Sequence, residues 1–263
     1  MEHWIDSAFE QAAVKFALGA KQAAAQGIIP YKSEGRRYVV SPFDGNSWWT
    51  GGFWPGMMWQ FYHATSEAVY RDEALRVEDL LTRELRAFDL LNHDVGFMYL
   101  LSTGAHYRLL GDKQALSDTL HAATLLAGRF NPAGFIRAWP GRERVGYAII
   151  DCMMNLSLLY WASEQTGDPR FAAIARIHAD TTMREFLRED GSACHIVVFD
   201  PVSGKALDRP AGQGYAPGSS WSRGQAWALY GFTLSHINTG EVRYLDAAGN
   251  RPATLFPTSA RTA

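Results

Sequence analysis

The chain has 263 residues, of which 47% are hydrophobic and 20% are charged, a composition typical of a globular protein with a large core. It carries 25 Lys and Arg against 27 Asp and Glu, so no excess of basic charge is present to neutralise nucleic-acid phosphates or to hold a membrane surface. No stretch reaches the roughly 18 apolar residues of a membrane span. We therefore expect neither a nucleic-acid partner nor a membrane partner.

The start of the chain and its cysteines bear on the cellular compartment. The first residues lack the basic stretch and apolar core of a secretion signal. Cys152 and Cys194 lie in apolar surroundings, whereas a secreted protein of this length more often carries a disulfide framework. We therefore predict a reducing, cytoplasmic compartment.

Four short turns divide the chain into helical hairpins. In each turn an apolar helix ends, a Gly or Ser follows, and an acidic residue opens a more polar helix. Glycine past a helix end supplies a left-handed cap, and an acidic residue in the next first turn meets the positive end of the helix dipole. The turns lie at residues 65–67, 110–112, 166–168 and 239–241.

The two helices of each hairpin differ in character. Helices that are apolar on nearly all sides, and therefore expected to be buried, are predicted at 52–62, 97–110, 148–161 and 221–234. Amphipathic helices are predicted near the start of the chain and at 71–88, 113–130 and 169–187. Buried helices wrapped by amphipathic ones indicate an all-α fold, an α/α toroid, with its pocket where the loops entering the inner helices converge. A short strand at 192–199 and a turn at 200–204 are predicted at that end.

Asp151 is the most informative acid, because the predicted helix around it has hardly another polar group. An unpaired carboxylate is costly to bury there, and the usual relief is that the group keeps its proton near neutral pH. A protonated carboxyl group in a cleft is a general acid. The alternative is a structural Asp that pairs with an Arg or caps a neighbouring helix.

Asp94 has two interpretations, which both stay open. An Asp directly before an apolar helix is the expected N-cap. Its neighbour His93, and its position at the same end of the predicted toroid as Asp151, instead favour a functional role. Two carboxylates on adjacent inner helices that face each other across a pocket are the usual equipment for glycoside chemistry.

Aromatic and basic side chains around the predicted pocket suit an acidic sugar. Trp54, Trp59 and Trp161 fall inside inner helices and are predicted to be core. Flat aromatic faces near the mouth suit sugar rings, and they belong to Trp48, Trp139, Trp221 and Trp227.

Arg223 could hold a carboxylate through two parallel hydrogen bonds, or could form a salt bridge to an acid in the core. His195 and Gln213 are candidate hydrogen-bonding residues. No motif for a metal, a phosphate loop or a serine nucleophile is present, so no cofactor and no metal are expected.

Several segments together resemble the unsaturated glucuronyl hydrolases, glycoside hydrolase family 88. They run in the order of that family over residues 1 to about 246, at 49–56, 93–97, 149–156, 188–192 with His195, and 220–227. The related unsaturated rhamnogalacturonyl hydrolases share the toroid and some of the acid-bearing helix, and they remain an alternative.

The resemblance implies an (α/α)6 toroid, a six-hairpin barrel, that removes 4,5-unsaturated glucuronic acid from the non-reducing end of oligosaccharides left by polysaccharide lyases. Members of this family hydrate a vinyl ether: an Asp, matched by Asp151, donates a proton to C4 and activates water for C5, after which the hemiketal opens. Asp94 matches the second essential Asp. Sugar-contacting residues are matched by His93, His195, Gln213, Arg223, Trp221 and Trp227, and more loosely by Trp48 and Trp139.

The end of the chain departs from the family pattern. Residues 1–248 are expected to form a partial toroid domain, incomplete at the C-terminus, whereas residues 249–263 contain Pro252 and Pro257 and show no helical periodicity. We expect an irregular tail, from a truncated or frame-shifted end, and a chain of low stability and weak or no activity. The alternative function is accordingly an inactive fragment that at most binds acidic sugars.

Overall fold

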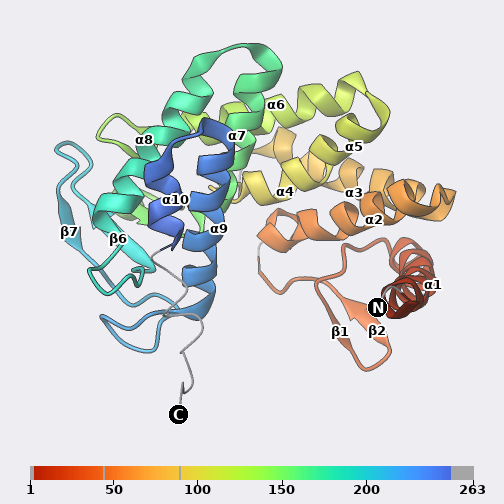
Figure 1. Ribbon diagram of the computed structural model, residues 1–263. Coiled ribbons are helices and arrows are strands. Elements are labelled where there is room, and N and C mark those ends of the chain that lie inside the picture. Colours follow the sequence, from red (N-terminus) through yellow and green to blue (C-terminus); the bar gives the residue numbers. More distant parts are fainter. Residues whose placement is uncertain (1–2, 44, 89, 250–263) are drawn as a thin grey trace. The chain divides into compact units, whose positions relative to one another are not determined.

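A computed structural model describes residues 3–43, 45–88 and 90–249 (Figure 1). These residues form two compact units, each described here by itself. The first contains the described residues of Met1–Leu91 and Phe97–Ala122, and the second those of Asn92–Gly96 and Ala123–Ala263. Within the described part of the chain, no helix is both long and apolar enough to cross a membrane.

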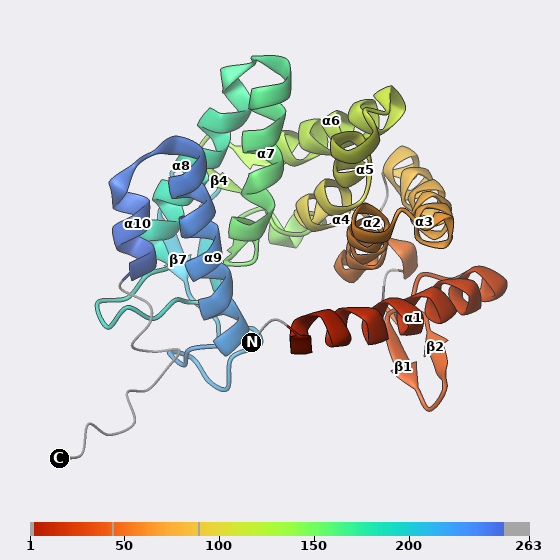
Figure 2. The same cartoon turned by 45° about the vertical axis from the view of Figure 1, so that its right-hand side comes forward.

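The first unit is built from helices and one small hairpin. Strands β1 (Lys32–Glu34) and β2 (Arg37–Val39) pair antiparallel, and Figure 2 shows them beside helix α1. The helices are α1 (His3–Gln26), α2 (Phe53–Thr65), α3 (Ala68–Ala87), α5 (Thr103–Leu110) and most of α4 (Val95–Leu101) and α6 (Lys113–Gly128).

The second unit combines two helical hairpins with short strands. Helix α7 (Cys152–Thr166) packs on α8 (Pro169–Glu185) and on α9 (Ser222–Thr239), which in turn packs on α10 (Val242–Gly249) (Figure 1). The strands form an antiparallel pair, β3 (Phe130–Asn131) with β4 (Phe135–Ile136), and a three-stranded sheet in the order β5 (Tyr147–Ile149), β6 (Ile196–Phe199), β7 (Ala206–Asp208).

The four predicted hairpin turns are confirmed. Each of the preceding helices ends at a residue in the left-handed conformation, with φ of 59° at Ser66, 69° at Gly111, 70° at Gly167 and 73° at Gly240. Glycine adopts this conformation without a steric cost, so only Ser66 departs from the usual chemistry.

Two predicted inner helices are wrong in part. The helix expected at 97–110 is interrupted at Ser102, whose hydroxyl donates to the carbonyl of Met98 (2.5 Å) and whose backbone leaves the helical region. The helix expected at 148–161 begins only at Cys152, because Tyr147–Ile149 form strand β5. A short apolar run fits a buried strand as well as a buried helix, and only pairing with β6 decides between them.

The predicted strand and turn near residue 200 are confirmed with narrower bounds. Strand β6 covers Ile196–Phe199, and the turn closes where the Gly204 N–H donates to the carbonyl of Asp200 (2.9 Å). The other strands were not predicted. At the far end, Gly249 is the last residue of α10, and the predicted irregular tail otherwise lies outside the described residues.

Candidate active site

Every candidate site residue except Trp48 belongs to the second unit. The pairing of β5 with β6 sets the centre of the group: Ile149 lies opposite Ile196, and the Ile150 N–H donates to the carbonyl of His195 (3.0 Å). Asp151 and His195 therefore lie at the same end of two adjacent strands. Asp151 directly precedes α7, at the N-cap position, and is not inside a helix as predicted.

Asp151 is not an unpaired carboxylate. The indole Nε1 of Trp227 donates to its Oδ1 (3.2 Å), and Nε2 of His195 lies 3.5 Å from its Oδ2. Its side chain keeps 15% of its surface exposed. One oxygen of the carboxyl group is thus held by Trp227, whereas Oδ2 has no hydrogen-bond partner among the described residues.

His195 is held in one tautomer. Its Nδ1 accepts a hydrogen bond from the Gln213 backbone N–H (2.9 Å), so the hydrogen of the neutral ring must be on Nε2, the atom that faces Asp151. The loop residue Gly212 (φ +58°) makes this contact possible, because a Cβ there would lie 1.9 Å from Nδ1. His195 therefore presents a hydrogen-bond donor to Asp151.

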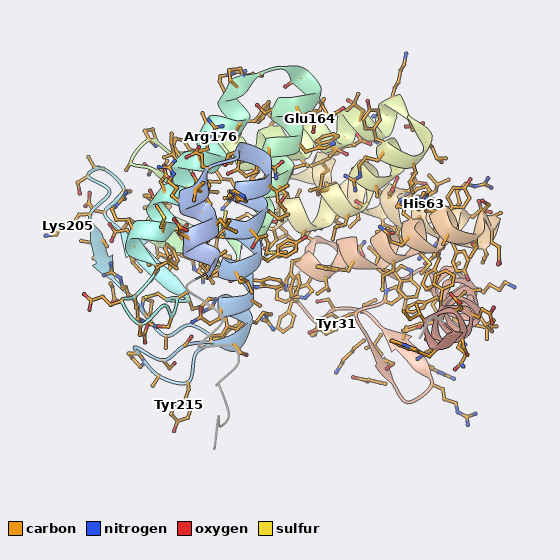
Figure 3. The ribbon with its side chains drawn as sticks, viewed as in Figure 1. Tyr31, His63, Glu164, Arg176, Lys205 and Tyr215 are labelled. Carbon is orange, nitrogen blue, oxygen red and sulfur yellow. The ribbon has the colours of Figure 1, made fainter. Side chains whose placement is uncertain are left out.

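An exposed cation lies next to these rings. The ring centroids of His195 and Trp221 are 4.4 Å apart, and the guanidinium of Arg223 stacks 4.3 Å above Trp221. Nη2 of Arg223 donates to Oε1 of Gln213 (2.8 Å). Arg223 is exposed and so does not serve as the predicted alternative of a core ion pair. The loop that carries Gln213 is marked in Figure 3 by Tyr215, whose side chain points into solvent.

Asp94 directly precedes helix α4, as the N-cap interpretation expects, and its backbone N–H donates to Oδ1 of Asn92 (2.7 Å). Its carboxyl group, 13% exposed, faces Nε2 of His93, with 3.1 Å between that atom and Oδ1. Asn155 of α7 also hydrogen-bonds to the carboxyl group. Gly96 permits this approach, since a Cβ there would lie 2.5 Å from Cα of Asn155.

The surroundings of Asp94 favour its protonated form. Burial is the largest influence and raises the pKa of Asp94, and the nearby charge of Asp151 raises it further. His93 and Asn155 act in the opposite direction without cancelling the effect. The sequence pointed to Asp151 as the acid that keeps a proton, whereas the structure shows this influence at Asp94.

His93 is held in the opposite tautomer to His195. Its Nδ1 lies 2.9 Å from the carbonyl oxygen of Ala138, which can only accept, so Nδ1 carries a hydrogen. In the neutral ring, Nε2 is then an acceptor turned toward Asp94. The ring of Trp139 meets that of His93 edge-on at 6.2 Å.

Some neighbours of the site were not assigned a role from the sequence. Asn155 is fully buried one helical turn after Asp151, and a polar residue in so apolar a helix was an available signal. Arg129 and the carbonyl of Ala138 gave no signal. Trp48 lies in the first unit, where its ring packs 4.5 Å from that of Phe43.

The described residues contain no group of three or more His, Cys, Asp or Glu side chains arranged to hold a metal ion. Cys152 and Cys194 are both buried and free. Burial raises the pKa of the Cys152 thiol well above its usual value, and the charge of Asp94 adds to the effect. The thiol is therefore neutral beside the two carboxyl groups.

The sequence of the chain is similar to those of known hydrolases. An unsaturated glucuronyl hydrolase of Bacillus sp. (strain GL1) is 40% identical over 226 residues, which are 84% of this chain and 59% of the relative. An unsaturated chondroitin disaccharide hydrolase of Streptococcus agalactiae serotype III (strain NEM316) is 40% identical over 198 residues, 73% of this chain and 49% of the relative. The chain thus spans about half to three fifths of the length of these two relatives.

Solved structures of similar hydrolases match the fold of the chain. The crystal structure of the unsaturated glucuronyl hydrolase of Bacillus sp. GL1 matches with a TM-score of 0.85 and 36% identity over 95% of this chain and 68% of the other. A Streptococcus agalactiae variant complexed with dGlcA-GalNAc6S matches with a TM-score of 0.74 and 30% identity over 93% of this chain and 61% of the other. These structures are α/α toroids, so the predicted all-α, toroid fold class is confirmed.

The family model described as Glycosyl Hydrolase Family 88 matches residues 22–239, most of the chain. It covers the residues around both carboxyl groups and both histidines. The chain therefore belongs to glycosyl hydrolase family 88.

Proposed function

We propose that the protein is a hydrolase that removes a 4,5-unsaturated glucuronic acid from the non-reducing end of an oligosaccharide. One observation carries this proposal: two carboxyl groups with unlike surroundings lie in one unit, Asp94 buried beside His93, and Asp151 bound by the Trp227 indole with its second oxygen 3.5 Å from His195. Pairs of acids whose environments differ in this way are typical of acid–base catalysis. The relatives named glucuronyl and chondroitin disaccharide hydrolases support the same class of substrate.

Hydration of the vinyl ether needs a proton at C4 and a water oxygen at C5. We assign both transfers to Asp151, which donates its proton to C4 and then takes a proton from the attacking water. The hemiketal formed at C5 opens, and the bond to the neighbouring sugar is lost with it. Trp227 supports this role because its hydrogen bond to Oδ1 orients the carboxyl group, and the ring of His195 lies beside the other oxygen. Asp94 holds a second proton close by and binds the sugar.

The carboxylate of the substrate is assigned to Arg223. Its guanidinium is exposed, lies against the ring of Trp221 and donates to Gln213, so its direction is fixed. Trp221 and Trp227 supply aromatic surface for the ring, and His93, His195 and Trp139 line the same group of residues. An unsaturated uronic-acid oligosaccharide is therefore the proposed ligand.

The test is the loss of ultraviolet absorbance, because hydration destroys the conjugated double bond of the substrate. Asp151→Asn should abolish this loss, since the amide has no proton to donate, and should leave sugar binding nearly intact. Asp246→Asn makes the same substitution at an exposed position of α10 and should retain the activity of the parent. Binding of the sugar by the parent chain without any loss of absorbance would instead support the function of a silent, sugar-binding protein.

We also propose that the protein works in the cytoplasm. Both of its cysteines are buried as free thiols, a state that a reducing compartment preserves. Fractionation of the source cells, followed by detection with an antibody, tests this location. Recovery of the protein in a secreted fraction would contradict it.

A further inference from the structure

Arg129 is a partly buried cation beside the proposed site. It lies between helix α6 and strand β3, where its Nε donates to the carbonyl of Arg137 (2.9 Å) and its Nη2 to that of Ala138 (3.0 Å). Within the described ranges, no carboxylate lies at ion-pair distance from its guanidinium. A partly buried arginine that donates to backbone oxygens and has no carboxylate partner in the described part of the chain is costly, so its presence needs an explanation other than stability.

The carbonyl of Ala138 is the point where Arg129 meets the site. Besides Nη2 of Arg129, this oxygen accepts from the backbone N–H of His93 (3.2 Å) and from the ring Nδ1 of His93 (2.9 Å). The N–H of Ala138 donates to the carbonyl of Tyr147 (2.8 Å) in β5, the strand that leads to Asp151. The backbone carbonyl and N–H of Ala138 together therefore link Arg129, His93 and the strand before Asp151.

The Ala138 carbonyl decides which way the ring of His93 faces. It accepts from Nδ1–H, and the ring then places Nε2 3.1 Å from Oδ1 of Asp94, without a hydrogen bond between these two atoms. The Nδ1–H tautomer and this placement of Nε2 both depend on the contact with the Ala138 carbonyl.

We infer that Arg129 is a positioning residue, which holds the Ala138 carbonyl so that His93 keeps its hydrogen on Nδ1 and places Nε2 beside Asp94. The effect on turnover rests on the proposed function, whereas the effect on the histidine ring does not. Arg129 touches no reacting atom in this scheme. It acts through one peptide group and one ring.

The charges around Asp94 agree with this arrangement. Burial lowers the pKa of Arg129 to about 10, which leaves it charged at neutral pH, and that charge lowers the pKa of Asp94. The other titratable groups that act on Asp94 are His93 and Asp151, and the neutral thiol of Cys152 lies nearby. His178 of α8 is neutral, because burial and the nearby His93 lower its pKa to about 3.

Two variants separate the geometry of Arg129 from its charge. Arg129→Met removes both hydrogen bonds and the charge. Arg129→Lys keeps the charge, but an ammonium group does not reproduce the planar fork that reaches two successive carbonyls. Arg108→Met is the matched control, because Arg108 of α5 is another arginine whose pKa is lowered by burial and which donates to a backbone carbonyl (3.3 Å) in the other unit.

The first measurement is the tautomer of His93, read from nitrogen-15 NMR spectra of histidine-labelled protein without any substrate. The parent should show His93 with hydrogen on Nδ1, and both Arg129 variants should show a mixture of tautomers. His195 and His178 are internal standards, because backbone N–H groups donate to their Nδ1 atoms and hold their hydrogens on Nε2. A Nδ1–H tautomer of His93 that is unchanged in folded Arg129→Met would overturn the inference.

The second measurement is turnover against pH. Both variants should lower kcat by about ten- to a hundredfold, as expected when a catalytic group is misplaced, with little change in KM. Only Arg129→Met should also move the limb of the pH profile that belongs to Asp94 to higher pH, because it alone removes the charge. Equal effects from Arg108→Met would show general destabilisation and contradict the inference. If the parent shows no turnover while the tautomer of His93 responds, the proposed function fails and the positioning role stands.

Discussion

Each unit contains an acidic side chain next to a tryptophan and a histidine, and the distances to these two partners differ between the units. In the first unit, Glu78 accepts from the indole of Trp59 (2.6 Å) and contacts Nδ1 of His106 (2.9 Å). In the second, the equivalent partners of Asp151 stand farther off, at 3.2 Å for Trp227 and 3.5 Å for His195. The same three side-chain types thus build a closed cluster in one place and an open one in the other.

Glu73 repeats the closed arrangement. It accepts from the indole of Trp54 (2.8 Å) and is bound by the guanidinium of Arg76 (2.7 Å), and it is only 3% exposed. Hydrogen bonds this short satisfy a buried carboxylate fully, and nothing is left for a ligand to complete. The comparison teaches that partner distance and remaining exposure, more than residue type, distinguish an acid that stabilises from one that can react.

The largest expected effect is on stability in the closed cluster. Glu78→Ala leaves the Trp59 indole and His106 without a partner, so the free energy of unfolding should fall by about 3–5 kcal/mol. Asp151→Asn should change it by less than about 1 kcal/mol. Urea unfolding measures both, with Asp79→Ala as the exposed control on the same helix. Equal losses at Glu78 and Asp151 would remove the distinction between the two clusters.

The open cluster should depend strongly on Gly212. In Gly212→Ala, the new Cβ meets His195 at 1.9 Å, so the ring must move and lose the Gln213 hydrogen bond. We expect kcat for chromophore loss to fall by about a hundredfold. Gly218→Ala is the control, since Gly218 has φ +82° in the same loop with open space around it. Similar losses in both variants would point to backbone strain alone.

Arg223 should contribute to binding and little to stability. Arg223→Lys cannot reproduce a two-point contact to a carboxylate, so binding of an unsaturated disaccharide should weaken by about 1.5–3 kcal/mol. Calorimetric titration in the Asp151→Asn background measures this without turnover. Arg209→Lys changes an exposed arginine paired with Glu185 and should bind as the parent does. Unchanged affinity in Arg223→Lys would return Arg223 to a structural role.

The smallest effect is a pH dependence of stability. Because the pKa of Asp94 is raised in the folded state, its contribution to stability is complete below about pH 4 and is lost as the pH rises through the folded pKa. Asp94→Asn should therefore gain stability relative to the parent as the pH increases, on the order of 1 kcal/mol.

Asp200 provides a control of opposite sign. Hydrogen bonds from Ser203 and Val202 lower the pKa of Asp200, so its contribution is present near neutral pH and is lost on acidification. Thermal melts of Asp94→Asn and Asp200→Asn between pH 3 and 7 should diverge. Parallel curves would contradict the raised pKa of Asp94.

The sequence was sufficient to predict the helical hairpins because their signals are local. A glycine at 111, 167 or 240 caps a helix by its own conformational freedom, and Trp54 and Trp59 are core because their helix is apolar on all sides. The structure brings the candidate site residues into one unit, except Trp48, which belongs to the other.

The environments of those residues were not predictable from local pattern. In the sequence, the residues of strand β5 look like the start of a helix, and only their pairing with β6 shows that they are not. Asp151 was therefore predicted to lie inside a helix, whereas the helix begins at Cys152. The tautomers of His93 and His195 depend on backbone groups of Ala138 and Gln213, which carry no mark in the sequence. The role that a histidine takes from a backbone hydrogen bond cannot be predicted from the residue types in the sequence.

The site is held together by contacts between residues far apart in the sequence, and this has a consequence for the order of folding. His93 meets Ala138 across 45 residues, and Trp227 meets Asp151 across 76, whereas each helical hairpin closes over a short turn. Chain entropy delays contacts between distant segments, so the hairpins should form first and the contacts around Asp94 and Asp151 last. In refolding experiments, helical signal should return before substrate affinity, and the interval between them measures the time the chain needs to bring its two acids together.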